Sequence, residues 1–446
     1  MKSKQVLNKN TNLRKVLGVP DGVAILVGIT IGAGIYSTPQ IIAGYQESFL
    51  SIIVLWLIVG LFVFVASLIY AELGTRFPET GGEYIYISRT FGSFLGFLFG
   101  WTQLFIIRTS ATAGLTIIAV NYLGYFITMT GLEQTILALL IISFLGYLNF
   151  IGVGAASLFQ KLSTLIKVIG LLLLVIIGII LIDSQTSLIG TKAIASQNLG
   201  VIGNTVAAFM LIIFTHTGWD RVGYVAGEMK NPKKVIPQTM IFGIGIIIIL
   251  YLSINFIYYN TLGIEGLRSS KIVASDTATH LIGPIGAGLV SILVIISAMG
   301  STNGTLMTAP RVYYAMSKDG LFFNWLNYVH PKYQTPSRAI IVHCVWASLI
   351  LIVRGQFETI AVGMVFAVLI FYLFTTAALI KQRKSNEGSG VFKMPLYPFL
   401  PIVFFIGITL LLLFRAYYEW EKSLIDLALI ATGIPFAIIW KRKKLR

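Results

Sequence analysis

Apolar stretches of about 20 residues recur along the chain and alternate with short polar segments. About 20 apolar residues are what an α-helix needs to cross the hydrocarbon core of a bilayer. The pattern therefore predicts an all-α membrane protein with about 12 transmembrane helices. We place these spans at 19–44, 49–74, 93–122, 133–150, 157–182, 201–228, 239–260, 280–312, 338–354, 357–380, 396–416 and 422–440.

The first span contains a cluster of residues that disfavour a helix. Gly28, Gly32 and Gly34 lie within seven residues, and Pro39 follows them. Because glycine costs about 1 kcal/mol relative to alanine inside a helix, the cluster is a candidate helix break. A break in a bilayer is tolerated only where its backbone groups line a protein cavity, and its free amides can bind an anion. The alternative is a packing face of small residues between helices.

A second candidate break lies in the sixth span, where residues 214–220 read Phe-Thr-His-Thr-Gly-Trp-Asp. Interruptions in corresponding halves of a membrane protein are typical of inverted-repeat transporters, whose substrate binds between the broken helices. We therefore expect a 5+5 inverted repeat with helices 1 and 6 broken. The expected parts are an N-terminal tail (1–18), the first repeat (19–182), the second repeat (201–380), two further spans (396–440) and a basic tail (441–446).

Composition and charge narrow the class of protein. The chain has 446 residues, of which 56% are hydrophobic and 11% charged, and its mean hydropathy of +0.85 excludes an ordinary soluble domain. Its net charge of +16 sits mostly in alternate loops, which indicates membrane topology and argues against nucleic acid as a partner. This distribution predicts a multi-pass protein of the cell membrane with both termini cytoplasmic. The first span is too long for a cleavable signal peptide.

Several motifs, taken together, resemble a known family. Residues 31–36 (Ile-Gly-Ala-Gly-Ile-Tyr) resemble the Gly-Ser-Gly-Ile-Phe motif of the amino acid–polyamine–organocation superfamily, and residues 70–74 with 78–84 are similar to its motif after span 2. Three further stretches resemble its L-type amino acid transporter branch, and more closely the bacterial serine/threonine and alanine-serine-cysteine exchangers. These stretches are residues 106–108, 218–220 with 228–232, and 300–304 with 315–320.

The resemblance implies sodium-independent exchange of amino acids across the membrane, with the substrate bound between the broken helices. The amides of Gly32, Ala33 and Gly34 can hold the substrate carboxylate, and glycine allows the close approach this needs. The resemblance suggests that free carbonyls of Thr30, Phe214 and Thr217 hold the ammonium group, and that Phe214 is a gate. An ordinary core aromatic is the alternative for Phe214.

This sequence departs from the family at Ala33, where serine is common, and at His216 and Thr217. These departures leave the side-chain preference of the substrate site open. Tyr36 and Trp219 are weaker candidates for walls of the same pocket.

Lys167 interrupts an otherwise apolar fifth span. An ionisable residue inside a membrane indicates function unless its long side chain reaches the interface, which is the alternative here. The family has a lysine at this position beside span 1, where sodium-coupled relatives bind the ion. The resemblance thus implies that the ammonium replaces sodium and bonds span 1 carbonyls, with Tyr251 of span 7 as a hydrogen-bonding partner nearby.

Other polar residues within or beside the spans have less specific roles. Arg108 is expected to be structural, with an unknown partner. His216 either carries a proton or, as we favour, hydrogen-bonds carbonyls at the break. Four glutamates near the predicted cytoplasmic face are expected to form ion pairs with Arg76, Arg89 or Lys230 that latch an inner gate. They are Glu72, Glu79, Glu83 and Glu228.

The sequence contains no pattern typical of an enzyme, a metal site or a cofactor site. The four histidines lack ligand spacing, and no nucleophile–base pair or phosphate-binding loop is present. Cys344 lies inside a predicted span, so we expect no disulfide-linked glycoprotein subunit. The predicted function is exchange of small neutral L-amino acids. The alternatives are a proton-coupled symporter using Lys167 or His216, and a membrane sensor that binds amino acids without transporting them.

Overall fold

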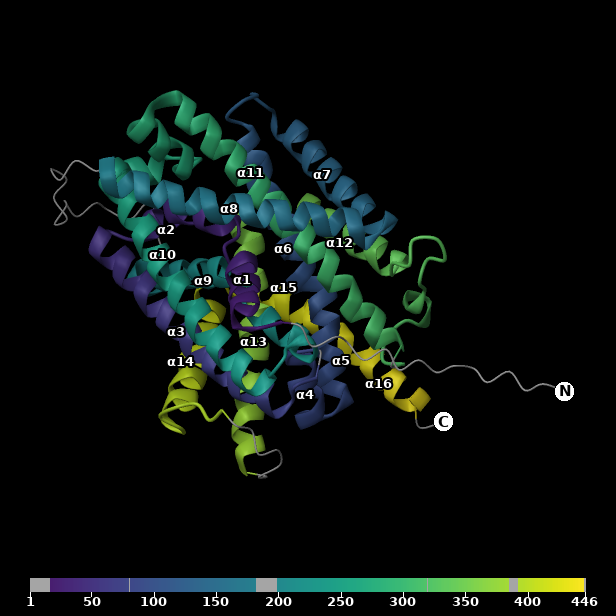
Figure 1. Cartoon of the computed structure of the whole chain (residues 1–446). Helices are drawn as coiled ribbons and strands as arrows, with labels where there is room; N and C mark the ends of the chain where they lie inside the picture. Colours follow the sequence, from purple (N-terminus) through teal and green to yellow (C-terminus); the bar gives the residue numbers. More distant parts are fainter. Residues whose placement is uncertain (1–16, 80, 182–198, 319, 385–391, 445–446) are drawn as a thin grey trace.

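The computed structural model describes residues 17–79, 81–181, 199–318, 320–384 and 392–444, and its regular elements in these ranges are helical (Figure 1). The predicted all-α class is confirmed. The α-helices are α1 (Val19–Thr30), α2 (Pro39–Tyr45), α3 (Phe49–Arg76), α4 (Glu83–Phe91), α5 (Ser93–Thr102), α6 (Arg108–Leu123), α7 (Gly131–Ile151), α8 (Val153–Leu181), α9 (Gly200–His216), α10 (Pro232–Ser269), α11 (Val273–Lys318), α12 (Ser337–Arg354), α13 (Phe357–Lys384), α14 (Phe399–Tyr418), α15 (Trp420–Ala431) and α16 (Gly433–Lys444). The 3-10 turns are η1 (Ala33–Tyr36), η3 (Trp219–Glu228) and η4 (Asn324–Asn327), and a π-helical turn, η2 (Gln103–Ile107), joins α5 to α6.

Eleven helical segments in the described ranges are long and apolar enough to cross a membrane, and the shorter apolar helix α1 adds to them. The segment predicted as the first span, 19–44, is divided among α1, η1 and α2. The other predicted spans correspond to helices, and α11 ends at Lys318. The chain is thus a multi-pass membrane protein. A count of twelve spans and the inverted repeat stay predictions.

Both predicted helix breaks are present. α1 ends at Thr30, and α2 begins at Pro39, whose fixed φ and missing N–H suit the first turn of a helix. In span 6, α9 ends at His216, and Gly218 adopts a φ of +122° before η3 begins. This φ is in the region that glycine tolerates and other residues rarely adopt. The local sequence therefore explains where α2 begins and why the chain leaves the helical path after α9.

The two breaks pack directly against each other. A Cβ atom placed on Gly34 would lie 3.1 Å from the Cα of Thr215, and one placed on Gly218 would lie 3.2 Å from the carbonyl oxygen of Ile29. The hydroxyl of Tyr251 in α10 lies 3.0 Å from the Thr30 carbonyl oxygen and 3.1 Å from that of Thr215. The glycines thus let the interrupted segments approach closely, and Tyr251 satisfies carbonyls that the helices leave unpaired.

The loop after α3 forms more structure than the sequence predicts. Residues 83–91 fold into α4. Gly81 and Gly82 adopt positive φ values just before it, and the chain changes direction there. The expected ion pairs of Glu72 with Arg76 and of Glu79 with Arg89 are present, at 2.9 Å each. Glu72 also pairs with Arg383, so a buried carboxylate ties α3 to α13.

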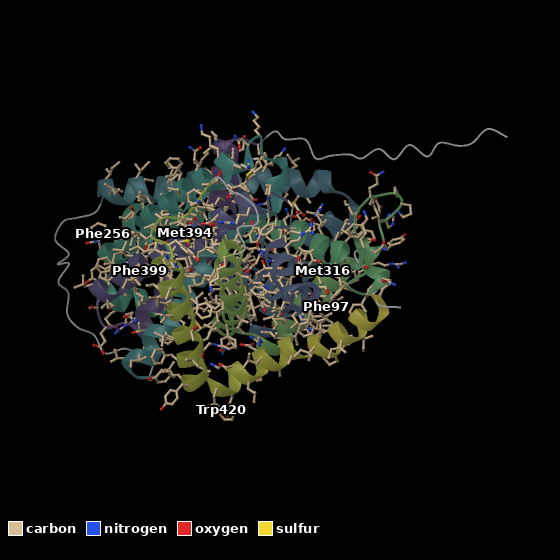
Figure 2. All side chains as sticks on the ribbon, turned by 90° about the horizontal axis from the view of Figure 1, so that it is seen from below. Phe97, Phe256, Met316, Met394, Phe399 and Trp420 are labelled. Atoms are coloured by element: carbon tan, nitrogen blue, oxygen red, sulfur yellow. The ribbon has the colours of Figure 1, made fainter. Side chains whose placement is uncertain are left out.

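Large apolar side chains fill the core and also lie exposed on the exterior, and Figure 2 labels examples such as Phe97, Phe399 and Trp420. Phe97 and Met316 belong to a smaller core cluster between α5 and α11, separate from the main core. Phe399 at the start of α14 and Trp420 at the start of α15 are 64% and 61% exposed. Many large apolar side chains are exposed in this way, as expected for a helical bundle whose outer surface faces the lipid of a bilayer.

Candidate functional site

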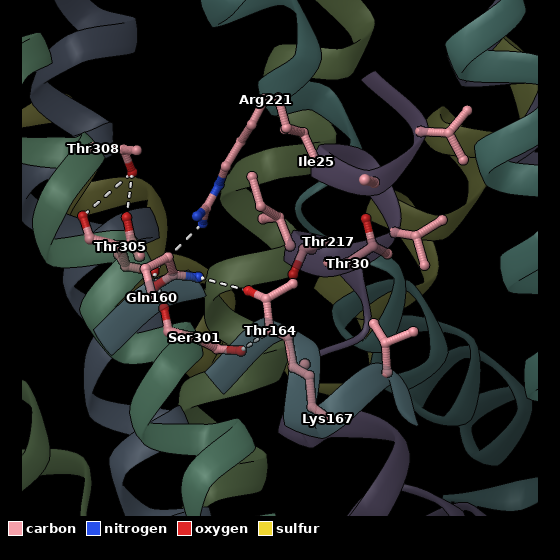
Figure 3. Close-up of a pocket in the computed structure, with 18 of the residues that line it drawn as sticks. Ile25, Thr30, Gln160, Thr164, Lys167, Thr217, Arg221, Ser301, Thr305 and Thr308 are labelled. Carbon is pink, nitrogen blue, oxygen red and sulfur yellow. Dashed lines mark hydrogen bonds between the residues drawn. The ribbon is translucent and has the colours of Figure 1, made fainter. Parts of the chain in front are cut away.

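A cavity of about 950 Å³ reaches from the beginning of α1 to both helix breaks (Figure 3). Val19 and Pro20 line it at the beginning of α1, and the exposed Lys161 lines it from α8. Residues of α6, α10 and α11 supply further parts of the wall. Of the residues predicted to bind substrate or to gate, these line the cavity: Thr30, Gly32, Gly34, Lys167, Phe214 and Thr217.

Two of the residues predicted for the site lie behind the cavity surface. Ala33 is fully buried, and Tyr251 lies behind the breaks, where its hydroxyl contacts their carbonyls. The weaker candidates Tyr36 and Trp219 are also core residues, and Trp219 packs edge-on against Tyr70 with ring centroids 4.8 Å apart. Among the described residues, the cavity lining therefore includes the predicted glycines but not these aromatic rings.

Some backbone groups at the breaks already have hydrogen-bond partners among the described residues, and others do not. The Gly32 amide donates to the Thr30 carbonyl at 2.7 Å, and the Thr217 amide and hydroxyl donate to the Phe214 carbonyl at 3.0 and 2.7 Å. The expectation that the Thr30 and Phe214 carbonyls are free is wrong, because an interrupted chain satisfies its own polar groups where it can. Gly34 lies at the start of η1, where the first amides of a helical turn lack partners within the turn.

Lys167 is completely buried and does not extend to the interface. Its ammonium donates to Ser301 Oγ of α11 at 3.4 Å, the only hydrogen bond it forms within the described part of the chain. The expected bonds to the carbonyls of span 1 are not formed, since Tyr251 and the Gly32 amide occupy the Thr30 carbonyl. α8 still touches α1, because a Cβ on Gly28 would lie 2.6 Å from Thr164 Cγ2. Lys167 thus joins α8 to α11 at the cavity wall.

The structure identifies the partner of Arg108. Its guanidinium lies 3.1 Å from the Asp220 carboxylate and also donates to Gln103 Oε1 at 2.7 Å. Both side chains of the ion pair are about nine-tenths buried. Arg108 therefore links α6 to η3, the segment that follows the second break, and its predicted structural character has a physical basis.

Two further polar side chains lie close to the second break. The His216 ring contacts the Ile212 carbonyl through Nδ1 at 2.9 Å and lies between Trp56 and Tyr251. A hydrogen bond to a carbonyl agrees with the role we favoured for it. Glu83 of α4 is buried beside Thr375, and this burial, with nearby Asp220, raises the pKa of its carboxyl to about 8. Within the described residues, Arg76 and Arg89 pair with Glu72 and Glu79, and Glu83 does not form the ion pair expected for it. The side chain of Glu228 lies outside the described residues.

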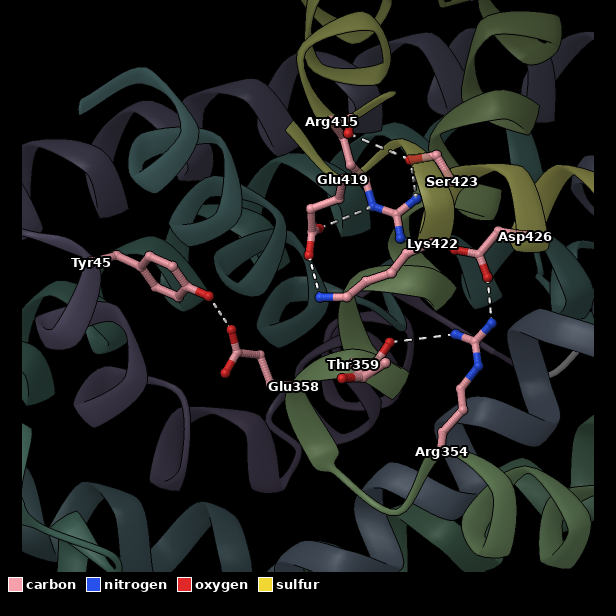
Figure 4. Close-up of polar contacts among 9 residues, drawn as sticks. All are labelled: Tyr45, Arg354, Glu358, Thr359, Arg415, Glu419, Lys422, Ser423 and Asp426. Atoms are coloured by element: carbon pink, nitrogen blue, oxygen red, sulfur yellow. Dashed lines mark hydrogen bonds and ion pairs between the residues drawn. The ribbon is translucent and has the colours of Figure 1, made fainter. Parts of the chain in front are cut away.

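The end of the cavity beyond the breaks is closed by aromatic and polar contacts. Phe214 packs edge-on against Phe357 at the start of α13, with ring centroids 5.2 Å apart. Nearby, Tyr45 at the end of α2 hydrogen-bonds Glu358 of α13 (Figure 4). Asp426 holds Arg354 and Arg415 in the same region, which fixes α15 against α12 and α14. The cavity is therefore closed beyond the breaks and extends towards the beginning of α1.

Several cavity residues were not identified from the sequence. Ser301 was included only within the motif at residues 300–304, and Thr305 and Gln160 were not identified. Arg221 was not singled out from the sequence either, although it lines the cavity. Polar residues at intervals of four within an apolar span, as at 301 and 305, are a signal that would have indicated a polar face of α11.

A polytopic helical protein with a central cavity between two interrupted helices belongs to the class of membrane transporters. A family model described as amino acid permease matches residues 17–432. The chain therefore belongs to the amino acid permease family, and the resemblance to the amino acid–polyamine–organocation superfamily is confirmed.

Characterised relatives cover nearly the whole chain. It is 30% identical over 407 residues to the serine/threonine exchanger SteT of Bacillus subtilis (strain 168), a match covering 90% of each chain. It is 27% identical over 448 residues to the b(0,+)-type amino acid transporter 1 of Mus musculus (97% of this chain and 89% of the relative). It is 28% identical over 443 residues to the large neutral amino acids transporter small subunit 2 of Mus musculus (97% and 82%). The family and these relatives are transporters, so the chain is not an enzyme.

Proposed function

We propose that this protein is a sodium-independent exchanger of small neutral L-amino acids that works by alternating access. The observation that carries the proposal is a cavity of about 950 Å³ that reaches both helix breaks, where backbone groups can bind the parts common to all amino acids. In this proposal the amide of Gly34 binds the substrate carboxylate, and Thr30 and Thr217 line the same cavity. The names of the relatives, which include exchangers of amino acids, support the same function.

In this proposal, residues 19–182 and 201–380 are the two repeats that move relative to each other. The protein resides in the plasma membrane with both termini cytoplasmic, so the described cavity opens inward. No disulfide-linked glycoprotein subunit is needed, because Cys344 lies within α12 and packs against Gly146 of α7.

Counterflow in proteoliposomes tests exchange against the alternatives. An exchanger takes up labelled serine or alanine only when the lumen holds an amino acid. A symporter responds to a pH gradient with an empty lumen, and a sensor moves nothing while still binding. Uptake that is equally fast into empty liposomes would contradict exchange, and an uptake screen with twenty amino acids defines the side-chain preference.

Exchange should persist when external sodium is replaced by choline at constant pH. The resemblance places the Lys167 ammonium where sodium-coupled relatives bind the ion, and the structure has this lysine fully buried. Initial rates of serine uptake in the two salts are the measurement, with potassium as a second replacement. A large loss of rate in both replacements would overturn the role of lysine in place of sodium.

Phe214→Ala should lower exchange more than it lowers folding. Truncating a buried phenylalanine costs about 3–5 kcal/mol wherever it lies, so stability alone does not identify a gate. Phe99 provides a matched control, because it is fully buried and packs edge-on against Phe371 at the same 5.2 Å separation. We expect similar losses of thermal stability in both variants, but a severalfold lower exchange rate per folded molecule only in Phe214→Ala. Equal rates would show that Phe214 is a core aromatic and not a gate.

A further inference from the structure

The walls of the cavity carry positive charge without a compensating negative charge. Lys161, Lys167 and Arg221 line it, and no aspartate or glutamate does so among the residues that the structure describes. Lys161 is exposed at the edge of the cavity, whereas Lys167 is fully buried. In a cavity enclosed by apolar helices, such charges interact with a ligand more strongly than they would in water.

Arg221 has most of its hydrogen-bonding capacity unused within the part of the chain that the structure describes. It lies at the start of η3, and one of its guanidinium nitrogens reaches Thr305 Oγ1 at 3.5 Å, the outer limit of a hydrogen bond (Figure 3). Its Nε atom is buried and has no hydrogen-bond partner among the described residues. A guanidinium has five N–H donors in a planar fork that matches a carboxylate. The adjacent carboxylate, Asp220, is held by Arg108 instead.

The position of Arg221 relative to the breaks suits a substrate side chain. Ser301 Oγ would lie 3.5 Å from a Cβ on Gly32, so Ser301 faces the first break. Thr305, which contacts Arg221, is one helical turn further along α11, and one turn advances about 5.4 Å. That distance corresponds to a short side chain extending from an amino acid whose own carboxylate lies at the break.

We infer that Arg221 is a specificity-determining residue that binds a side-chain carboxylate, so that the transporter accepts small acidic amino acids such as aspartate and rejects cationic ones. The inference rests on the proposed function, because it assumes an amino acid in this cavity. A carboxylate would complete the unused donor fork of Arg221 in a charge-assisted pair. A lysine or arginine substrate would instead place a second cation among three positive side chains.

Competition tests this inference on the purified full-length protein. Unlabelled L-aspartate, L-serine and L-lysine are titrated against labelled serine, both in liposome counterflow and in equilibrium binding to the detergent-solubilised protein. For the wild type we expect aspartate to compete and lysine to fail. Arg221→Gln should weaken aspartate about 10- to 100-fold relative to serine, the range expected for losing a hydrogen-bonded charge partner.

Three further variants distinguish recognition of the substrate's charge by Arg221 from a nonspecific loss of folding or activity. Arg221→Lys should restore part of the preference for aspartate, and Arg221→Glu should shift the preference towards lysine. Lys234→Gln, which removes an exposed charge in the first turn of α10, should leave the ratio of aspartate to serine unchanged. If the Arg221 variants do not fold, the order in which aspartate, serine and lysine compete in the wild type still decides whether the site accepts an acidic side chain and rejects a cationic one.

Two outcomes would overturn the inference, and a third concerns the proposed function. Failure of aspartate to compete with serine in the wild type would exclude an acidic substrate. An equal effect of Arg221→Gln on aspartate and serine would exclude side-chain recognition by Arg221. Absence of serine counterflow together with intact binding would overturn exchange but leave the binding comparison valid.

Discussion

Replacing Lys167 with alanine should lower the rate of amino acid exchange about 10- to 100-fold, the range that corresponds to losing a hydrogen bond from a charged group. The ammonium lies completely buried between α8 and α11 and donates to Ser301 at 3.4 Å. Without it, α8 loses a polar connection to α11 at the cavity wall. The backbone groups at the breaks remain, so substrate affinity should fall less than turnover.

Two measurements on the same preparation test this prediction. Scintillation proximity measures substrate binding, and counterflow in liposomes measures exchange. Lys233→Ala removes an exposed lysine at the start of α10 and serves as the control for loss of one positive charge. Unchanged exchange kinetics in Lys167→Ala would mean that the side chain has no part in coupling, despite its burial.

Asp220→Ala should destabilise the fold by about 3–5 kcal/mol, because removing one partner of a buried ion pair leaves the other charge uncompensated. Arg108 and Asp220 are 3.1 Å apart, and their side chains are only 10% and 9% exposed. The pair connects α6 to η3, so its loss also loosens the segment after the second break. Thermal unfolding in detergent, followed by size-exclusion chromatography, measures the loss of folded protein.

The chain contains a matched exposed ion pair for comparison. Glu79 and Arg89 are 2.9 Å apart, but their side chains are 49% and 58% exposed. Glu79→Ala should therefore cost at most about 1 kcal/mol, as surface ion pairs typically do. The double variant Arg108→Met/Asp220→Leu should recover part of the loss, since neither charge remains buried alone. If Asp220→Ala is no less stable than Glu79→Ala, the buried pair does not support the fold.

The architecture was largely predictable because a bilayer restricts the possible folds. Apolar windows located the spans, and glycine at 32, 34 and 218 located the breaks, since backbone conformation depends on local sequence. α4 was missed because the nine residues from Glu83 to Phe91 are too short and too polar for a hydropathy window. Its start depends on positive φ values at Gly81 and Gly82, which a hydropathy pattern does not represent.

The site was predictable only in part, because side-chain partners depend on tertiary contacts. Lys167 stood out as a charge in an apolar span, but its contact with Ser301, 134 residues away, left no local signal. The partner of Arg108 was equally hidden, because Asp220 is 112 residues away. Arg221 was not recognised, because it lies shortly before Lys230, Lys233 and Lys234 in the sequence and nothing local separates it from these charges. The carbonyl of Thr30 was expected to be free, because its donor, the Tyr251 hydroxyl, comes from another helix and cannot be recognised from the sequence around Thr30.

The Tyr251 hydroxyl has one hydrogen and two carbonyl neighbours, Thr30 of span 1 and Thr215 of span 6. A single proton cannot form two full-strength hydrogen bonds, so the two broken helices share it as a bifurcated donor. Moving either carbonyl away would let the proton bond fully to the other and would leave the first without this donor. The energy of each break thus depends on the position of the other, so the two helices are expected to change conformation in concert.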